Sequence, residues 1–312
     1  MKRKLITVFL LPSLLSAGSL DFYLDYFVKK RKEFSRKFID LTEELDNYIS
    51  GNYIGYAPVE DNYLKVTFST RFKDGRLRFN PSVRARIDLP KTRNKFQLVL
   101  TEHDEEITHQ DIGEEYGDKK QSYGSLLGLK YFINNKIFTK TSLSVGLKFK
   151  TPLDFYTRLK LLRVWDLSEK WQLIGEQKFY LFSHRGFQSF TTVNFDRKID
   201  SVFMFRISNN AIYKKKEDLL EIGHSLMLFQ HLTKRDDLIY SASVYGKTEN
   251  LENKPPAVSA YEIRTVYRHI LKNRWITFSV IPAVYWDRDH SFNPNLSLSF
   301  NFSILFGKYD IY

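Results

Sequence analysis

The last regular segment of the chain alternates between apolar and polar residues, and this pattern limits the possible fold more than any other feature. In NLSLSFNFSILF, residues 295–306, every even-numbered position from Leu296 to Phe306 is apolar, and the odd-numbered positions up to Ser303 are serine or asparagine. Successive side chains of a β-strand point to opposite faces, so a strand separates these two sets completely. A helix would scatter both kinds around its surface. The segment therefore predicts a strand between an apolar and an aqueous environment.

Similar alternation recurs from about residue 63 onward, in runs separated by short turn sequences such as Lys73-Asp74-Gly75-Arg76. We count fourteen runs, near residues 63–72, 77–89, 95–103, 122–133, 138–150, 154–166, 171–182, 187–197, 200–213, 218–231, 237–247, 258–271, 275–286 and 295–306. Each run has at least the roughly nine residues that a tilted transmembrane strand needs. The runs 154–166 and 200–213 have the weakest pattern, and loss of one hairpin would leave twelve strands.

The lengths of the connections are typical of a membrane barrel. The long connections, residues 104–121, 248–257 and 287–294, follow the third, eleventh and thirteenth runs, so all three would lie on one side of a membrane. Outer-membrane barrels have short turns on one side and longer loops on the other. We therefore expect an all-β, transmembrane antiparallel barrel over residues 62–306, with fourteen strands or, as the alternative, twelve. The competing fold, a soluble β-sandwich, has strands of about five or six residues.

The first eighteen residues have the three parts of a secretory signal peptide. A basic start, Lys2 to Lys4, precedes an apolar core, Leu5 to Leu15, and a small-residue exit, Ser16 to Ser19. The apolar core is too short for a membrane-spanning helix, which needs about 20 residues. We expect residues 1–18 to be cleaved on export.

Residues 20–50 predict one amphipathic helix before the barrel, because the segment contains no glycine or proline until Gly51. Its apolar residues recur at spacings of three, four and seven: Tyr23, Phe27, Phe34, Phe38, Leu41, Leu45 and Tyr48. Three positions fit this pattern. The helix could plug the barrel, lie on the inner leaflet, or hold a periplasmic protein at the periplasmic rim, which is the preferred site.

The signal peptide, the long alternating strands and the aromatic last strand resemble Gram-negative outer-membrane β-barrel proteins, over roughly residues 63–306. Within that class the chain is similar to porin-like barrels with an N-terminal helix and no assigned activity. The resemblance implies that the barrel assembly machinery recognises the last strand through Ser299, Asn301, Ile304 and Phe306. It also implies an outer-membrane location in contact with membrane lipid and lipopolysaccharide. Asn301 stands where glycine is usual, and Gly307 to Tyr312 follow Phe306.

Strand parity predicts that many charged side chains point into the barrel. The expected basic residues are Arg84, Arg86, Lys140, Lys148, Lys150, Arg158, Lys160, Arg206, Arg264 and Arg268, and the expected acidic ones are Asp88, Glu176, Glu221 and Glu262. Arginine offers paired donors to anions, so such a lining would favour anionic solutes. The alternative is a structural lattice of salt bridges, because buried charges are usually paired.

Catalytic and metal-binding motifs have weak support in this sequence. The adjacent pairs His224-Ser225 and His290-Ser291 are the nearest to a hydrolase, but neighbouring residues on a strand point to opposite faces. Eight carboxylates within residues 102–118 are interpreted as a solvated outer loop, since their spacing fits no calcium motif. The chain has no cysteine, which excludes disulfides and thiolate metal sites. We expect no enzymatic activity, no cofactor, no metal and no nucleic-acid partner.

The predicted function is an outer-membrane pore or channel-like barrel with a net cationic lumen, of unknown solute. Lipopolysaccharide phosphates, anionic solutes or a basic periplasmic face could each account for the formal charge of +12. The alternative is a non-conducting structural or assembly barrel whose N-terminal helix binds a periplasmic protein. A third hypothesis, an outer-leaflet lipid hydrolase, would depend on His290.

Overall fold

The computed structural model describes residues 17–50, 62–89, 92, 95–101, 126–136, 138–149, 151–248, 256–271 and 275–307. These residues form one long α-helix, two short 3-10 helices and fourteen strands. The predicted signal peptide lies outside the described residues except for its last two positions, with which the helix begins.

The elements follow the predicted runs closely. In chain order they are α1 (Ala17–Ser50), β1 (Tyr63–Lys73), β2 (Arg76–Leu89), β3 (Phe96–Thr101), β4 (Leu126–Asn135), β5 (Thr139–Lys148), β6 (Asp154–Asp166), β7 (Trp171–Phe182), β8 (Gly186–Lys198), β9 (Phe203–Lys214), β10 (Leu219–His231), β11 (Asp236–Thr248), β12 (Ala257–Ile270), β13 (Ile276–Asp287) and β14 (Pro294–Gly307). The prediction of fourteen strands is confirmed. The two runs with the weakest pattern are β6 and β9, which are both full-length strands.

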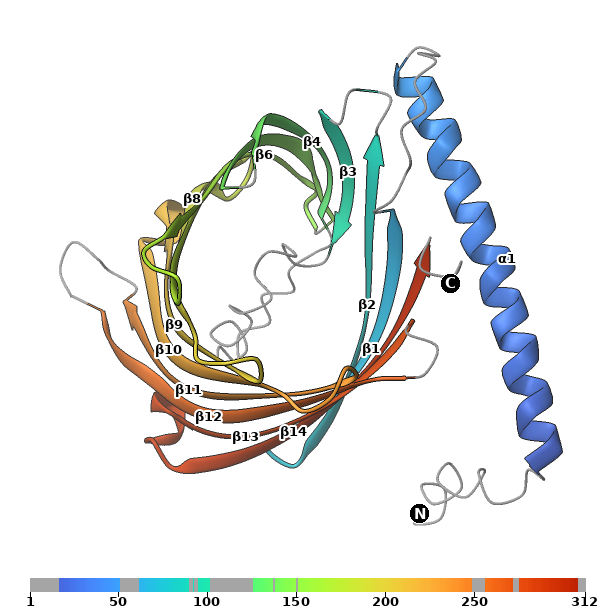
Figure 1. Cartoon of the computed structure of the whole chain (residues 1–312). Helices are drawn as coiled ribbons and strands as arrows, with labels where there is room; N and C mark the ends of the chain where they lie inside the picture. Colours follow the sequence, from blue (N-terminus) through green and yellow to red (C-terminus); the bar gives the residue numbers. More distant parts are fainter. Residues whose placement is uncertain are drawn as a thin grey trace.

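Every strand pairs antiparallel with its neighbours in sequence, and β1 pairs with β14, so the sheet closes into a barrel (Figure 1). The closing pair runs in continuous register from Tyr63 opposite Gly307 to Lys73 opposite Ser297. A closed barrel has no free strand edge, so its backbone groups are hydrogen-bonded without help from water. The β1–β2 turn has positive φ at Asp74 and Gly75, which is the geometry that a two-residue hairpin with native strand twist requires.

The alternation of side chains separates an apolar outer face from a polar inner face. On β14, Leu296, Leu298, Phe300 and Phe302 are exposed on the outside, whereas Ser299 and Ser303 are buried on the inside. A soluble barrel would have the reverse arrangement, with its aromatic residues in the core. Lipid is the environment that would cover such a face. No helix among the described residues is long and apolar enough to cross a membrane.

The inner face also contains one aromatic cluster, which lies where two glycines leave room for it. Tyr156 lies over Gly128 and Gly146 on the neighbouring strands, and a Cβ atom added at either glycine would collide with its ring. Tyr180 and Phe182 pack beside Tyr156, with ring centroids 6.1 and 6.0 Å away. An aromatic ring that covers a strand glycine restores packing that the missing side chain would otherwise lose.

Helix α1 lies outside the barrel, beside the wall that β1, β2 and β14 form (Figure 1). Its contacts gather at the rim where Tyr63 and Gly307 lie, which we call the terminal rim. There the Arg31 guanidinium donates to the carbonyl of Leu305, with Nε 2.9 Å from the oxygen, and lies 4.1 Å from the ring centroid of Trp275. These contacts place the helix on the outer wall, so the described residues do not support a plug in the lumen.

The two faces of β14 provide a direct test of the membrane orientation. Changing Phe300→Arg puts a charge on the outer face near the middle of the strand, where lipid exposure should cost about 2–4 kcal/mol. Changing the adjacent inward residue, Asn301→Arg, should cost much less. The measurement is the fraction that migrates as a compact barrel in an unboiled detergent gel after refolding into lipid. Equal losses for the two variants would contradict the assignment of the faces.

Candidate functional site: the charged inner wall

The strand registers place the predicted lumen residues on one face of the sheet. The basic residues on this face are Arg84, Arg86, Lys140, Lys148, Arg158, Lys160, Arg206, Arg264 and Arg268. The acidic residues on the same face are Asp88, Glu176, Glu221 and Glu262. Lys150 lies outside the described residues. About half of this set is buried, and Arg158 and Lys160 are almost completely so, whereas Lys140 and Arg268 are exposed. Two parts of the wall differ in how these charges are arranged.

The wall from β6 to β12 carries ion pairs, and we call it the paired arc. Glu176 lies 2.8 Å from the ammonium of Lys160 and 2.6 Å from that of Lys178. Arg206 forms a two-pronged contact with Asp196, with Nε–Oδ1 and Nη2–Oδ2 distances of 2.6 and 2.5 Å. This part of the wall resembles the salt-bridge lattice that the sequence left open as an alternative.

Two further pairs extend the paired arc on either side of β10 and β11. Lys214 lies 3.5 Å from Glu221, and Arg268 lies 2.5 Å from Asp237. Sequence reasoning missed four partners: Lys178, Asp196, Lys214 and Asp237. Lys178 and Lys214 share the parity of Glu176 and Arg206 on their own strands, so their inward direction could have been predicted. The predicted inward set contains no residue of β8 or β11, and pairing across strands requires the register.

The β1–β2 hairpin has the opposite arrangement, with like charges facing each other. In its register, three inward basic residues of β1 each lie directly opposite an inward basic residue of β2. The pairs are Lys65 and Arg84, Arg71 and Arg78, and Lys73 and Arg76. Like charges at directly opposed positions destabilise a sheet. The hairpin therefore brings six basic side chains to one part of the inner wall.

The inner wall has a small recess between this hairpin and β12, where the intervening side chains are small. One cross-strand row runs from Lys73 through Ser297 and Ala283 to Arg264. Serine and alanine therefore lie between two cations, and they leave space that larger residues would fill. The recess is lined by Arg71, Lys73, Glu262, Arg264, Ile281, Ala283, Ser297 and Ser299. We call the hairpin cations and this recess the basic arc.

The side chains of the recess are held in place by specific contacts. Arg71 Nε donates to Ser299 Oγ at 3.1 Å, and the Lys73 ammonium lies 4.0 Å from the ring centroid of Tyr285. Glu262, the acidic residue of the recess lining, is buried, and its carboxylate lies 3.7 Å from Arg264 Nε. One carboxylate among three cations leaves the recess positively charged. Fixed cations beside hydroxyl donors are suited to binding an anion.

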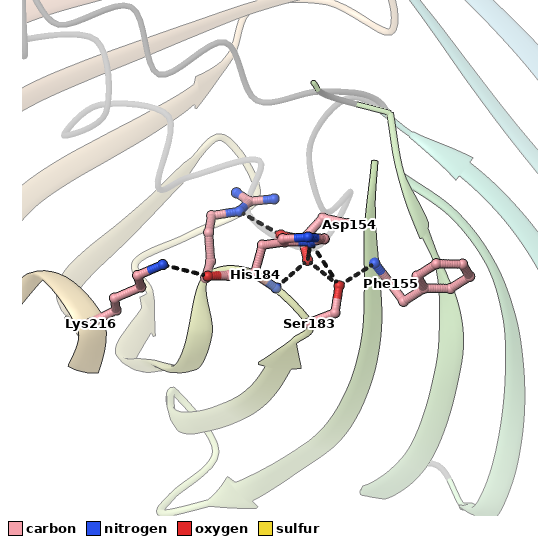
Figure 2. A network of polar contacts seen from close by, with 6 residues as sticks. Asp154, Phe155, Ser183, His184 and Lys216 are labelled. Carbon is pink, nitrogen blue, oxygen red and sulfur yellow. Dashed lines mark hydrogen bonds and ion pairs between the residues drawn. The ribbon is translucent and has the colours of Figure 1, made fainter. Parts of the chain in front are cut away.

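A serine, a histidine and an aspartate that contact one another lie at the rim opposite the terminal rim. Figure 2 shows Ser183, Asp154 and His184 in one network of polar contacts. Ser183 Oγ donates to Asp154 at 2.8 Å, accepts from the backbone N–H of Phe155 at 3.1 Å, and lies 3.1 Å from His184 Nδ1. In a catalytic triad the carboxylate orients the histidine, which then activates the serine. Here the carboxylate binds the serine hydroxyl itself.

The remaining contacts of this network connect three hairpins. Asp154 also accepts from the backbone N–H of His184 and from Arg185 Nε, both at 2.9 Å, and Lys216 donates to the His184 carbonyl at 2.9 Å. The network therefore ties the β7–β8 turn to the start of β6 and to the β9–β10 connection. These contacts hold the three rim turns together, which indicates a structural role.

The two histidine–serine pairs singled out from the sequence do not form sites either. His224 contacts Asn209 on the outer face at 2.7 Å, whereas Ser225 contacts Ser243 on the inner face at 2.8 Å. His290 Nδ1 lies 2.6 Å from Asp287 Oδ1, and this contact raises the pKa of His290 above its usual value. The described residues contain no cluster of three or more histidine or carboxylate groups fit to hold a metal ion, and the acidic stretch 102–118 lies outside them.

The residues of the expected assembly signal lie on both faces of β14. Ser299 and Asn301 face inward, whereas Ile304 and Phe306 face outward near the terminal rim. Phe306 contacts Phe34 of the helix edge to face, with ring centroids 5.1 Å apart. The helix therefore covers part of this segment in the folded protein.

A closed antiparallel barrel with an apolar outside and a charged inside is stable in a bilayer, since lipid covers the first face and the second lines the interior. These features define the chain as an outer-membrane β-barrel protein, as the sequence predicted. No protein-family model and no curated protein matches it.

Among solved structures the chain is similar to several outer-membrane barrels at low identity. A loop-deletion mutant of OmpT, an outer-membrane protein of Vibrio cholerae, aligns with 10% identity and a TM-score of 0.47, over 78% of this chain and 98% of that one. The outer-membrane channel DcaP of Acinetobacter baumannii aligns with 9% identity and a TM-score of 0.47, over 79% and 96%. The NanC porin aligns with 10% identity and a TM-score of 0.40, over 77% and 98%.

The buried Arg206–Asp196 pair allows a test of whether the paired arc contributes to stability. Asp196→Asn should destabilise the barrel by about 3 kcal/mol or more, because it leaves a buried guanidinium without its carboxylate. The double variant Asp196→Asn with Arg206→Met should recover much of that loss. Urea unfolding of the refolded protein measures both. A loss below about 1 kcal/mol for the single variant would mean that water screens the pair.

The contact between His290 and Asp287 predicts a titration in the connection between β13 and β14. Because the pKa of His290 is raised, its stabilising contact is fully present below pH 6.5 and is lost as the pH rises through the raised value. Asp287→Asn should return the pKa towards 6.5. NMR titration of the His290 ring protons measures the change. An identical midpoint in both proteins would contradict the contact.

Proposed function

We propose that the protein is an outer-membrane pore that prefers anions, with the basic arc as the selective part of its lumen. The observation that carries this proposal is the set of three like-charged pairs on the β1–β2 hairpin, in which Arg71 opposes Arg78. Their placement has an electrostatic cost in the folded sheet. An anion that passes these residues would offset the repulsion between the opposed cations, so anion binding would explain why like charges face each other here.

The two arcs would have different roles in such a pore. The paired arc carries ion pairs such as those of Glu176 and Asp196, so it would mainly support the wall. The basic arc presents arginine and lysine next to small hydroxyl residues, and rings or rows of fixed charge set the preference of a pore. The solute would then be an anion that contacts the recess between Lys73 and Arg264 as it passes.

Reversal potentials in planar bilayers under a potassium chloride gradient test this proposal. The natural protein should show open channels whose reversal potential is displaced towards that of chloride. Arg71→Gln with Arg78→Gln should move it at least halfway towards zero, because two inward charges are removed.

The matched control is Arg163→Gln with Arg197→Gln, which removes two exposed arginines from the outer face. This control should keep the reversal potential of the natural protein. A natural channel without ion preference, or equal effects of the two double variants, would refute the anion-preferring pore.

The paired arc favours a second candidate, a non-conducting structural or assembly barrel. The ion pairs around Glu176 and Asp196 are those that such a packed lattice would contain. This candidate predicts no conductance in the natural protein, and a large fall in stability when Arg206 or Lys160 is neutralised. A periplasmic protein bound at α1 would belong to this candidate.

We further propose the steps that bring the protein to its membrane. The signal peptide of residues 1–18 would direct export, and the barrel assembly machinery would recognise Ser299, Asn301, Ile304 and Phe306. The rim with the β7–β8 turn would then face lipopolysaccharide outside the cell, and the terminal rim the periplasm. The contacts of Ser183 and His290 support a structural role for both, so we propose no lipid hydrolase activity.

A further inference from the structure

Helix α1 is attached to the barrel by a narrow polar stripe. Arg31, Ser35 and Thr42 are 2%, 3% and 1% exposed, and their spacings of four and seven put them on one side of the helix. Arg31 binds the Leu305 carbonyl, and Ser35 Oγ accepts the backbone N–H of Gly307 at 3.4 Å. This stripe fixes which side of the helix faces the barrel, and therefore which sides do not.

The neighbouring stripe of the helix is apolar and remains exposed. Phe27, Phe34 and Leu41 recur every seven residues and are 41%, 47% and 60% exposed. A helix of a water-soluble domain would turn such a stripe towards its core. The exposed stripe therefore requires a covering partner.

The position of this stripe indicates what covers it. Phe34 contacts Phe306, which lies on the outer, lipid-facing side of β14, and Phe27 lies 5.9 Å from the ring of Trp275. The apolar stripe of α1 thus adjoins the apolar outer surface of the barrel at the terminal rim. A surface that continues a lipid-covered belt is covered by the same lipid.

The charges of the helix specify the kind of lipid. Lys30 and Lys37, seven residues apart, flank the apolar stripe, and both are exposed. Lys29, Lys32 and Arg36 add positive charge to the same two turns, against one acidic residue, Glu33, whose carboxylate lies 2.8 Å from the Lys30 ammonium. An apolar stripe bordered by lysines is typical of helices that lie in the headgroup region of a membrane and bind anionic lipids.

We propose that α1 lies in the inner leaflet beside the barrel, with Phe27, Phe34 and Leu41 at the acyl boundary and Lys30 and Lys37 on the phosphates of anionic phospholipids. Arg31 and Ser35 hold the helix to the end of β14 at the same time. The helix thereby connects the closing strand of the barrel to the lipid surface. This surface is independent of whether the lumen conducts ions.

The absence of cysteine from the sequence makes a single label straightforward. Leu41→Cys carrying an environment-sensitive fluorophore reports the apolar stripe, and Glu43→Cys reports a position about 200° around the helix. The full-length barrel is placed in nanodiscs of phosphatidylcholine, with or without phosphatidylglycerol. Compact migration in an unboiled gel confirms that each labelled protein is folded.

The label at position 41 should be quenched by lipids with a quencher near the headgroup end of the acyl chain, about twofold more in the anionic nanodiscs. The label at position 43 should instead be quenched by aqueous iodide. Lys30→Gln with Lys37→Gln should remove the dependence on anionic lipid. Lys29→Gln with Arg36→Gln, the same charge change away from the stripe, should affect it less.

Two results would overturn the proposal. Iodide quenching of position 41 as strong as that of position 43, in both kinds of nanodisc, would place the stripe in water, where a periplasmic protein could cover it. Quenching at position 41 that is equal in neutral and anionic nanodiscs would remove the assigned role of Lys30 and Lys37.

Discussion

The pairing of β1 with β14 is the interaction on which the rest of the structure depends. It joins the two ends of a sheet along the whole of β1, from Tyr63 to Lys73. In lipid an unpaired strand edge would leave a row of backbone donors and acceptors without partners, at a cost of several kcal/mol for each group. Closure removes that edge. It also turns the two faces of the sheet into an inside and an outside, so each residue's parity decides whether it meets lipid or the lumen.

Closure also explains why the charged residues can be so numerous without a conventional core. The inner face contains buried ions such as Lys178 and Glu176, whose mutual contact offsets part of their desolvation. The outer face carries the apolar surface instead. On the β1–β2 hairpin, by contrast, Arg71 lies directly opposite Arg78, and directly opposed like charges repel each other. A local conflict of this kind is where function is most reasonably sought.

The sequence predicted the strands well because a membrane strand must alternate over its full length, and that signal is local. It predicted inward parity for residues such as Arg84 and Arg264 for the same reason. It did not predict the recess, because the row from Lys73 to Arg264 crosses four strands and depends on three registers. Arg71 and Lys73 were missed because the β1 run was recognised as a strand without assigning its faces.

The helix shows a different limit of sequence reasoning. Its apolar face was evident from the spacing of Phe27, Phe34 and Leu41, and the usual inference is that such a face packs on protein. The structure instead attaches α1 through Arg31, Ser35 and Thr42, which no periodicity of apolar residues could indicate. Burial lowers the pKa of the Arg31 guanidinium to about 10, so it stays charged at neutral pH while it binds the Leu305 carbonyl.

The contact between α1 and the barrel lies at the end of the closing strand, β14. At the terminal rim β14 ends, and the backbone N–H of Leu305 pairs with the carbonyl of Trp275 in the β12–β13 connection. The carbonyl of Leu305 accepts from Arg31, whose guanidinium also stacks on the Trp275 ring. A charged donor is a strong partner for a carbonyl at the end of a sheet, where the backbone ladder stops. The same residue therefore completes the hydrogen bonding of the closing strand and sets which stripe of α1 is left for the membrane.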